Sequence, residues 1–220
     1  MNHISNRRGA IHCAQVLSII GVIIGILSTG MVMAKGEGDP KEGKSKSELC
    51  QSCHGPDGNS DNAMFPKLAG QKKGYIVKQI TDFQSGNRVN ETMTGMAATI
   101  ASLEDAKDIA AYFSTQTTKK NGKGESKLAK MGEALFLNGN ASIGVYGCVN
   151  CHGPNGQGKS PTNNVFPVIG RQHKDYLLNQ LKAFKTGERK NDPAGMMGDI
   201  AKKLSDKDIE AVSEYLSSLD

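Results

Sequence analysis

The sequence predicts an all-α protein made of two similar helical domains in tandem. A five-residue motif, Cys-x-x-Cys-His, occurs twice, at residues 50–54 and 148–152. Downstream of each motif the sequence repeats itself, with matching residues 101 positions apart, as from Phe65-Pro66 to Phe166-Pro167. Apolar residues recur at the spacing of amphipathic helices, whereas alternation typical of strands is absent.

The two motifs indicate covalent attachment of c-type haem. The two thiols of a motif can each add across a haem vinyl group, and the histidine that follows can bind the iron from the proximal side. A zinc site would need four ligands from two distant pairs and would leave the histidines without a role. A redox dithiol would not explain the histidines either. The predicted attachment residues are Cys50, Cys53, Cys148 and Cys151, and the predicted proximal ligands are His54 and His152.

The first 34 residues have the pattern of an export signal. Arg7 and Arg8 precede an apolar stretch over residues 16–27, and the small residues before Lys35 suit cleavage after Ala34. The alternative is an uncleaved anchor, because residues 11–34 carry no charge and are long enough to span a bilayer. Both interpretations place the rest of the chain outside the cytoplasm, and we expect a periplasmic protein.

In the chain after residue 34, the net charge bears on the class of partner, and the composition indicates where one domain ends and the next begins. Without Arg7 and Arg8 the formal charge falls from +5 to +3, and haem propionates would bring it close to zero, which gives no support for nucleic-acid binding. Residues 117–126 contain no apolar side chain and are rich in Lys, Gly and Ser, as in a solvated linker. We therefore expect a first domain over residues 35–116 and a second over residues 127–220.

Each domain is expected to contain an opening helix, a middle helix and a terminal helix. Ser102 and Ser205 suit the N-cap of the terminal helices, since each precedes an aspartate by three residues. A domain of this length is marginal for a core of side chains alone, so a porphyrin would supply apolar surface for the helices to pack against. The expected opening and middle helices cover residues 41–49, 75–83, 128–137 and 176–184.

A six-coordinate haem needs a second axial ligand, for which methionine is the best candidate in both domains. His173 is the one histidine after residue 34 outside the motifs, so it could complete at most one bis-histidine haem. Two methionines precede each terminal helix: Met93 and Met96, then Met196 and Met197. We favour Met93 and Met197, which each stand four residues before an alanine, although Met96 aligns with Met197 at the 101-residue spacing.

These features together resemble the dihaem cytochrome c4 family. The resemblance rests on both haem motifs, the stretches 65–71 and 93–98, and the two terminal helices. It implies two class I cytochrome c domains, with the first methionine of the Met-x-x-Met-Ala stretch, Met93, as axial ligand. It also implies that the Pro66 and Pro167 carbonyls accept the Nδ1 proton of the proximal histidines. Arg171 departs from the family pattern, which has glycine there.

The resemblance implies electron transfer without catalysis. The expected partners are redox proteins: a membrane quinol-oxidising complex as donor and a terminal oxidase or reductase as acceptor. Peripheral association with the membrane is compatible with this role. One alternative is a dihaem subunit of a larger oxidoreductase, such as a flavocytochrome sulfide dehydrogenase. Another is a dihaem peroxidase or thiosulfate dehydrogenase, which would need an open or unusual distal position at one iron.

The short linker predicts that the two domains pack face to face. Ten residues do not let two domains of this size drift far apart. We expect the haem propionate edges near the shared interface, with electron exchange between the haems.

Overall fold

The computed structural model describes residues 36–122, 126–159 and 166–219. The predicted leader over residues 1–34, with its cleavage site after Ala34, lies outside the described residues. Among the helices that the structure describes, none is long and apolar enough to cross a membrane.

The described residues are helical, which confirms the predicted all-α fold class. The first domain, here called module 1, contains α1 (Pro40–Lys46), α2 (Glu48–His54), α3 (Lys73–Gln84), α4 (Glu91–Ala98) and α5 (Leu103–Ser114). Module 2 contains α6 (Lys127–Asn138), α7 (Val149–His152), α8 (Lys174–Thr186), α9 (Met196–Lys203) and α10 (Asp206–Ser217). Short 3-10 turns η1, η2 and η3 cover Ala141–Ile143, Pro154–Gly156 and Pro193–Gly195.

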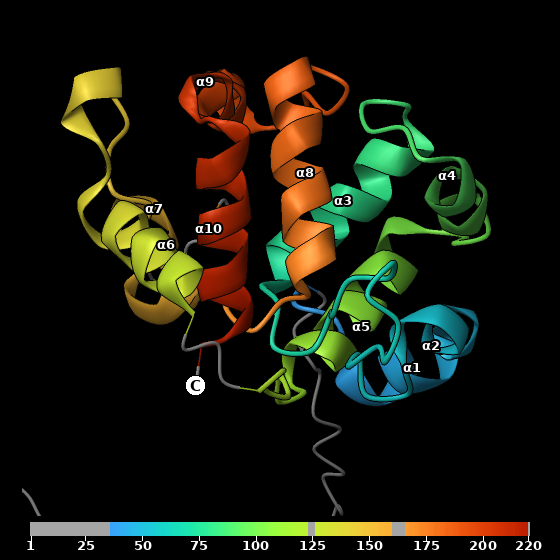
Figure 1. Ribbon diagram of the computed structural model, residues 1–220. Helices are drawn as coiled ribbons and strands as arrows, with labels where there is room; N and C mark the ends of the chain where they lie inside the picture. The colour runs from blue at the N-terminus through green and yellow to red at the C-terminus, as the bar shows by residue number, and fades with distance from the viewer. Residues whose placement is uncertain (1–35, 123–125, 160–165, 220) are drawn as a thin grey trace, which may run out of the picture. The chain divides into compact units, whose positions relative to one another are not determined.

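The two modules use the same helix contacts. In module 1, α5 packs against α1 and α3, and α3 packs against α4; in module 2, α10 packs against α6 and α8, and α8 packs against α9 (Figure 1). Each module has its own apolar core, centred on Phe113 in module 1 and on Phe136 in module 2. The repeat in the sequence is therefore a repeat of packing as well.

The first and last helices of each module cross at a glycine. A Cβ atom on Gly43 would lie 1.9 Å from the carbonyl oxygen of Asp108, and one on Gly132 would lie 2.0 Å from that of Ala211. Both distances are far below van der Waals contact. The helix pairs α1–α5 and α6–α10 can approach this closely because no side chain stands at the crossing.

The helix boundaries follow the predicted caps. The hydroxyl of Ser102 accepts the N–H of Asp105, and the hydroxyl of Ser205 accepts that of Asp208, which confirms both N-caps. The opening helix of module 1 is shorter than expected, because it ends at Lys46. Ser47 caps it, with its hydroxyl on the Lys44 carbonyl, and a separate helix then carries the first Cys-x-x-Cys-His motif.

Module 2 has a longer connection between its opening helix and its motif. Seven residues lead from Gly43 to Cys50, but sixteen lead from Gly132 to Cys148. The additional residues form η1 and an isolated bridge between Asn140 and Val145. Tyr146, at the end of this segment, is exposed.

The described part of the linker is solvent-exposed, as expected, but it is fixed to both modules. In module 1, Asn59 Oδ1 accepts the N–H of Lys119 at 2.7 Å. In module 2, Asn121 Nδ2 donates to the carbonyls of Arg171 and Gln172, at 2.9 and 3.0 Å. Residues 117–122 are therefore held against both modules, through the Thr117 carbonyl, the Lys119 N–H and the Asn121 side chain.

We predict that Gly132→Ala lowers the free energy of unfolding by about 1–3 kcal/mol, the usual cost of overpacking a close contact. The new methyl group would force α6 away from α10. Guanidinium denaturation of the holoprotein, followed by far-ultraviolet circular dichroism, measures the change. Gly36→Ala is the control, since nothing lies within 4 Å of its Cβ position. Equal stability of the two variants would contradict the close crossing.

Candidate haem sites

The proximal histidines occupy equivalent, buried positions. His54 ends α2 and is 5% exposed, and His152 ends α7 and is 6% exposed. His54 Nδ1 lies 2.8 Å from the Pro66 carbonyl oxygen, and His152 Nδ1 lies 3.0 Å from that of Pro167. A carbonyl can only accept, so each Nδ1 carries the proton. The contacts expected from the family resemblance are confirmed.

This arrangement prepares each imidazole for iron. With the proton on Nδ1, the Nε2 lone pair is available as a ligand. Burial lowers the pKa of both histidines, against a smaller opposing effect of the carbonyl contact. The neutral form that binds iron is therefore favoured. The edges of Phe65 and Phe166 lie beside the two rings, with centroids 6.2 and 6.4 Å away.

Cys50 and Cys53 lie in α2, whereas Cys148 is the N-cap of α7 and Cys151 lies within that helix. Burial raises the pKa of Cys50, and it raises that of Cys148 to about 11. No cluster of three or more His, Cys, Asp or Glu side chains in the described ranges could hold a metal ion. Each cysteine pair is followed by a buried histidine whose Nδ1 proton is engaged, and the described residues bring no further zinc ligand to it, so the donor set fits covalent haem.

The favoured distal methionines lie in the first turn of α4 and of α9. Met93 and Met197 each precede, by one helical turn, an alanine that is fully buried, Ala97 or Ala201. Met93 packs against the core cluster of module 1. Met196 is 37% exposed, more than its neighbour Met197. The choice of Met93 and Met197 stays a prediction.

The spare histidine, His173, is engaged elsewhere. Its Nε2 lies 2.9 Å from both the carbonyl and the hydroxyl oxygen of Ser60, in the other module. Because the carbonyl only accepts, Nε2 donates to it. His173 also stands at the N-cap of α8. This contact favours a structural role for His173 over axial ligation.

Two glutamines bind the proximal loops of opposite modules. Gln71 accepts the N–H of Val168 and donates to its carbonyl, both at 2.8 Å. Gln172 does the same for Lys67, at 2.8 and 2.9 Å. Lys67 and Val168 directly follow the prolines that orient the proximal histidines. Each proximal loop is thus held by the partner module, which confirms the expected packing of the modules against each other.

A second set of reciprocal contacts involves two arginines. Arg88 donates to Gln79 in its own module and to Gln180 across the interface, both at 2.8 Å. Arg189 donates to Gln180 at 2.8 Å and to Gln79 across the interface at 3.3 Å. The Arg88 guanidinium also lies over the ring of Phe83 in its own module and donates to the Tyr176 hydroxyl in the other. In the same way, the Arg189 guanidinium lies over Phe184 and donates to the Tyr75 hydroxyl.

The sequence carries a signal for this interface in its repeated polar residues, separate from the Cys-x-x-Cys-His motifs. The interface glutamines, tyrosines and arginines are all matched pairs of the 101-residue repeat. Repeated polar residues at these positions indicated a shared role, but periodicity assigned only the tyrosines, Gln79 and Gln180 to helices and gave no partner for any of them. Their contacts depend on the placement of one module on the other.

Arg171 occupies a backbone position that suits glycine. Its φ is 62°, and its counterpart in module 1, Gly70, has a φ of 69°. Both N–H groups donate to the last turn of a terminal helix, at the carbonyls of Leu216 and Phe113. Arg171 Nε is buried without a hydrogen-bond partner. The departure from the family pattern therefore carries a local cost in module 2.

Comparisons with known proteins match this geometry. The family described as Cytochrome c matches residues 41–117 and 129–220. Cytochrome c4 of Thiocapsa roseopersicina is 46% identical over 183 residues, which cover 83% of this chain and 93% of that protein. A thiosulfate dehydrogenase electron acceptor of Stutzerimonas stutzeri is 38% identical over 172 residues, which cover 77% of this chain and 78% of that protein.

The fold is also similar to a solved structure. The crystal structure of reduced recombinant cytochrome c4 from Pseudomonas stutzeri superposes with a TM-score of 0.77 and 42% sequence identity. The match covers 83% of this chain and 100% of that one. Both domains are therefore part of the likeness.

We predict that Arg171→Gly raises the free energy of unfolding by about 1 kcal/mol. The left-handed conformation costs an L-residue roughly 1–2 kcal/mol, and the greater freedom of glycine in the unfolded chain offsets part of this gain. Guanidinium denaturation measures it. The matched variant Gly70→Ala should do the opposite, since its Cβ would lie 2.8 Å from Thr118 Oγ1. A loss of stability in Arg171→Gly would show that the arginine side chain stabilises the fold.

Proposed function

Because this chain belongs to the cytochrome c4 family and carries two covalently bound haem c groups, we propose that it shuttles electrons in the periplasm between a respiratory donor and an acceptor. It is a dihaem electron-transfer cytochrome rather than an enzyme. The proposed donor is a membrane quinol-oxidising complex, and the proposed acceptor is a terminal oxidase or reductase. The export signal that the sequence predicts over residues 1–34 supports the location.

We propose His/Met coordination at both irons, with Met93 opposite His54 and Met197 opposite His152. Methionine favours ferrous iron and raises the potential, which suits a carrier that accepts electrons from a quinol-oxidising complex. The engagement of His173 Nε2 with Ser60 supports this assignment, since it occupies the one other histidine of the described chain. A closed distal position leaves no iron site for a substrate.

The observation that carries the proposal is the reciprocal binding of the proximal loops. Gln71 and Gln172 each hold the backbone just after the proline that contacts the other module's histidine. Two haem sites joined in this way remain at a fixed separation during turnover. Such a pair can accept an electron at one haem and release it from the other, and like charge added at one site disfavours reduction of its neighbour.

A second candidate is the electron acceptor of a thiosulfate-oxidising enzyme. The relative from Stutzerimonas stutzeri carries that description at 38% identity. In this role the chain would take electrons from a sulfur-compound dehydrogenase instead of a quinol-oxidising complex. The alternative of a subunit permanently bound to a larger oxidoreductase is related, but it requires a stable complex.

Stopped-flow mixing separates these candidates. We predict that the oxidised protein is reduced faster by a quinol-oxidising complex with quinol than by a thiosulfate dehydrogenase with thiosulfate, at equal enzyme concentration. Absorbance of the reduced haems measures both rates. The opposite order would favour the second candidate, and co-purification of a flavoprotein in fixed proportion would favour the subunit alternative.

Replacement of the methionines tests the ligands. We predict that Met197→Ala removes half of the near-infrared charge-transfer band of ferric Met-ligated haem, lowers one potential, and lets the ferrous protein bind carbon monoxide. Met196→Ala should leave all three properties unchanged. The reverse behaviour would assign Met196 as the ligand. The single variants Met93→Ala and Met96→Ala are compared in the same way in module 1, where Met93→Ala is expected to remove the ligand.

A further inference from the structure

The two modules hold their distal methionine segments in different ways. Asn90 and Asn191 are equivalent in the repeat and stand shortly before the favoured methionines. Asn90 is the N-cap of α4, and its side-chain oxygen accepts the N–H of Met93 at 2.9 Å. Asn191 instead contacts the other module. The repeat therefore breaks at a residue next to the distal ligand.

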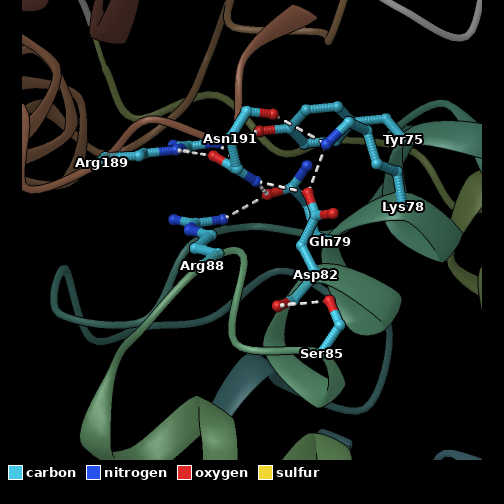
Figure 2. A network of polar contacts seen from close by, with 8 residues as sticks. All are labelled: Tyr75, Lys78, Gln79, Asp82, Ser85, Arg88, Arg189 and Asn191. Carbon is cyan, nitrogen blue, oxygen red and sulfur yellow. Dashed lines mark hydrogen bonds and ion pairs between the residues drawn. The ribbon is translucent and has the colours of Figure 1, made fainter.

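Asn191 uses its side chain and its carbonyl on the interface (Figure 2). Its Nδ2 donates to Gln79 Oε1 at 2.9 Å and to Asp82 Oδ2 at 2.6 Å, both on α3 of module 1. Its backbone carbonyl accepts from Lys78 Nζ at 2.8 Å. Its Oδ1 accepts from Arg189 Nε at 3.0 Å. Four hydrogen bonds thus fix this one residue, three of them to α3.

The partner carboxylate is buried, which makes the contact costly to lose. Asp82 is 7% exposed and also pairs with Lys78. Without Asn191 the carboxylate would lose a donor in a place that water does not reach easily. The pair with Lys78 would remain, so the cost is that of one lost hydrogen bond to a charged, buried group.

The opposite contact is not matched, because module 2 keeps the counterpart of Gln79 but not those of Lys78 and Asp82. The repeat positions of Lys78 and Asp82 are Asn179 and Ala183 on α8. Ala183 offers no side-chain acceptor for an asparagine of module 1. The sequence therefore provides the contact from Asn191 to Asp82 but not the reverse contact from Asn90 to module 2.

A short, well-defined path leads from Asn191 to Met197. The adjacent Asp192 accepts the N–H groups of Met197 and Gly198 through Oδ2, at 2.8 and 3.1 Å. Between them, η3 has left-handed backbone at Ala194 and Gly195. Asn191 is thus connected to the start of α9 by the chain to Asp192 and by two hydrogen bonds.

Module 1 anchors its methionine helix within itself. Gln84 Nε2 on α3 donates to the carbonyls of Ala97 and Ile100, at 3.0 and 3.1 Å. The equivalent residue of module 2 is Lys185, which pairs with Asp206 instead. The carbonyls that follow α9 therefore lack this internal anchor.

We infer that Asn191 and Asp82 form a one-way tether by which module 1 positions the distal methionine segment of module 2. They are positioning residues, since they act on Met197 through the chain. This inference rests on the proposed ligation by Met197. It predicts that contact with module 1 protects the second haem against loss of its distal ligand, whereas Met93 ligation does not depend on the interface in this way.

Competition by imidazole tests the tether in the ferric holoprotein. Imidazole displaces the methionine, and the near-infrared band reports the fraction of Met-ligated haem. Proton spectra of the same ferric samples resolve the signal of each iron-bound methionine methyl group, and Met93→Ala and Met197→Ala assign these signals to the modules. We expect Asn191→Ala to lower the imidazole concentration at half-displacement about tenfold at the second haem, and less than twofold at the first.

Two further variants complete the test, one on the same contact and one on the other module. Asp82→Asn removes the charge but keeps the shape, and should move the same haem in the same direction. Gln84→Ala breaks the internal anchor of α4 and should move the first haem alone. Unfolding midpoints of all variants show whether a change exceeds general destabilisation.

The outcomes separate the inference from its premise. If Met197→Ala leaves the near-infrared band intact, the proposed ligand is wrong, and the tether inference falls with it. If Met197→Ala halves the band but Asn191→Ala and Asp82→Asn leave the imidazole titration of the second haem unchanged, the tether alone is overturned. Equal shifts at both haems in Asn191→Ala would also overturn it, because the effect would then be general.

Discussion

The backbone groups of Lys67 and Val168 need hydrogen-bond partners, and the opposite module supplies them. Gln172 and Gln71 meet both the N–H and the carbonyl of these residues. Lys67 is 6% exposed, so its unpaired backbone would not be solvated in place. If the modules separated, the backbone N–H and carbonyl groups of Lys67 and Val168 would lose these hydrogen bonds. The orientation of each proximal histidine, through the preceding proline, is thus linked to an intact interface.

The linker adds to this constraint, although its composition suggests freedom. The buried ammonium group of Lys67 donates to the Lys119 carbonyl and to Asn121 Oδ1. Burial lowers the pKa of Lys67, and the nearby cations Lys119 and Arg171 lower it further. Linker oxygens therefore solvate a charge that the modules bury. A short chain pinned at both ends loses little additional entropy when the modules pack together.

Small departures from the repeat give the modules different properties on a common plan. The arginine pair and the glutamine pair are reciprocal, so each module makes the same contacts to the other. Arg171 adds a charge and a strained backbone to module 2 alone. Asn191 ties one distal segment to the neighbour, whereas Gln84 ties the other to its own module. Two haem sites with different supports can differ in potential and in resistance to ligand loss.

The sequence by itself determined the opening, middle and terminal helices, the caps of the terminal helices and the haem attachment chemistry, since these depend on local spacing, but it did not predict the short helices α2, α4, α7 and α9. Ser102 and Ser205 cap helices because their hydroxyls reach backbone three residues away, and Cys-x-x-Cys-His places two thiols and a ligand within one short helix. Only the tertiary structure decided the roles of Gln71, Asn191 and the linker. Their partners lie about a hundred residues away or on both modules, and periodicity carries no information on how two helical modules turn toward each other.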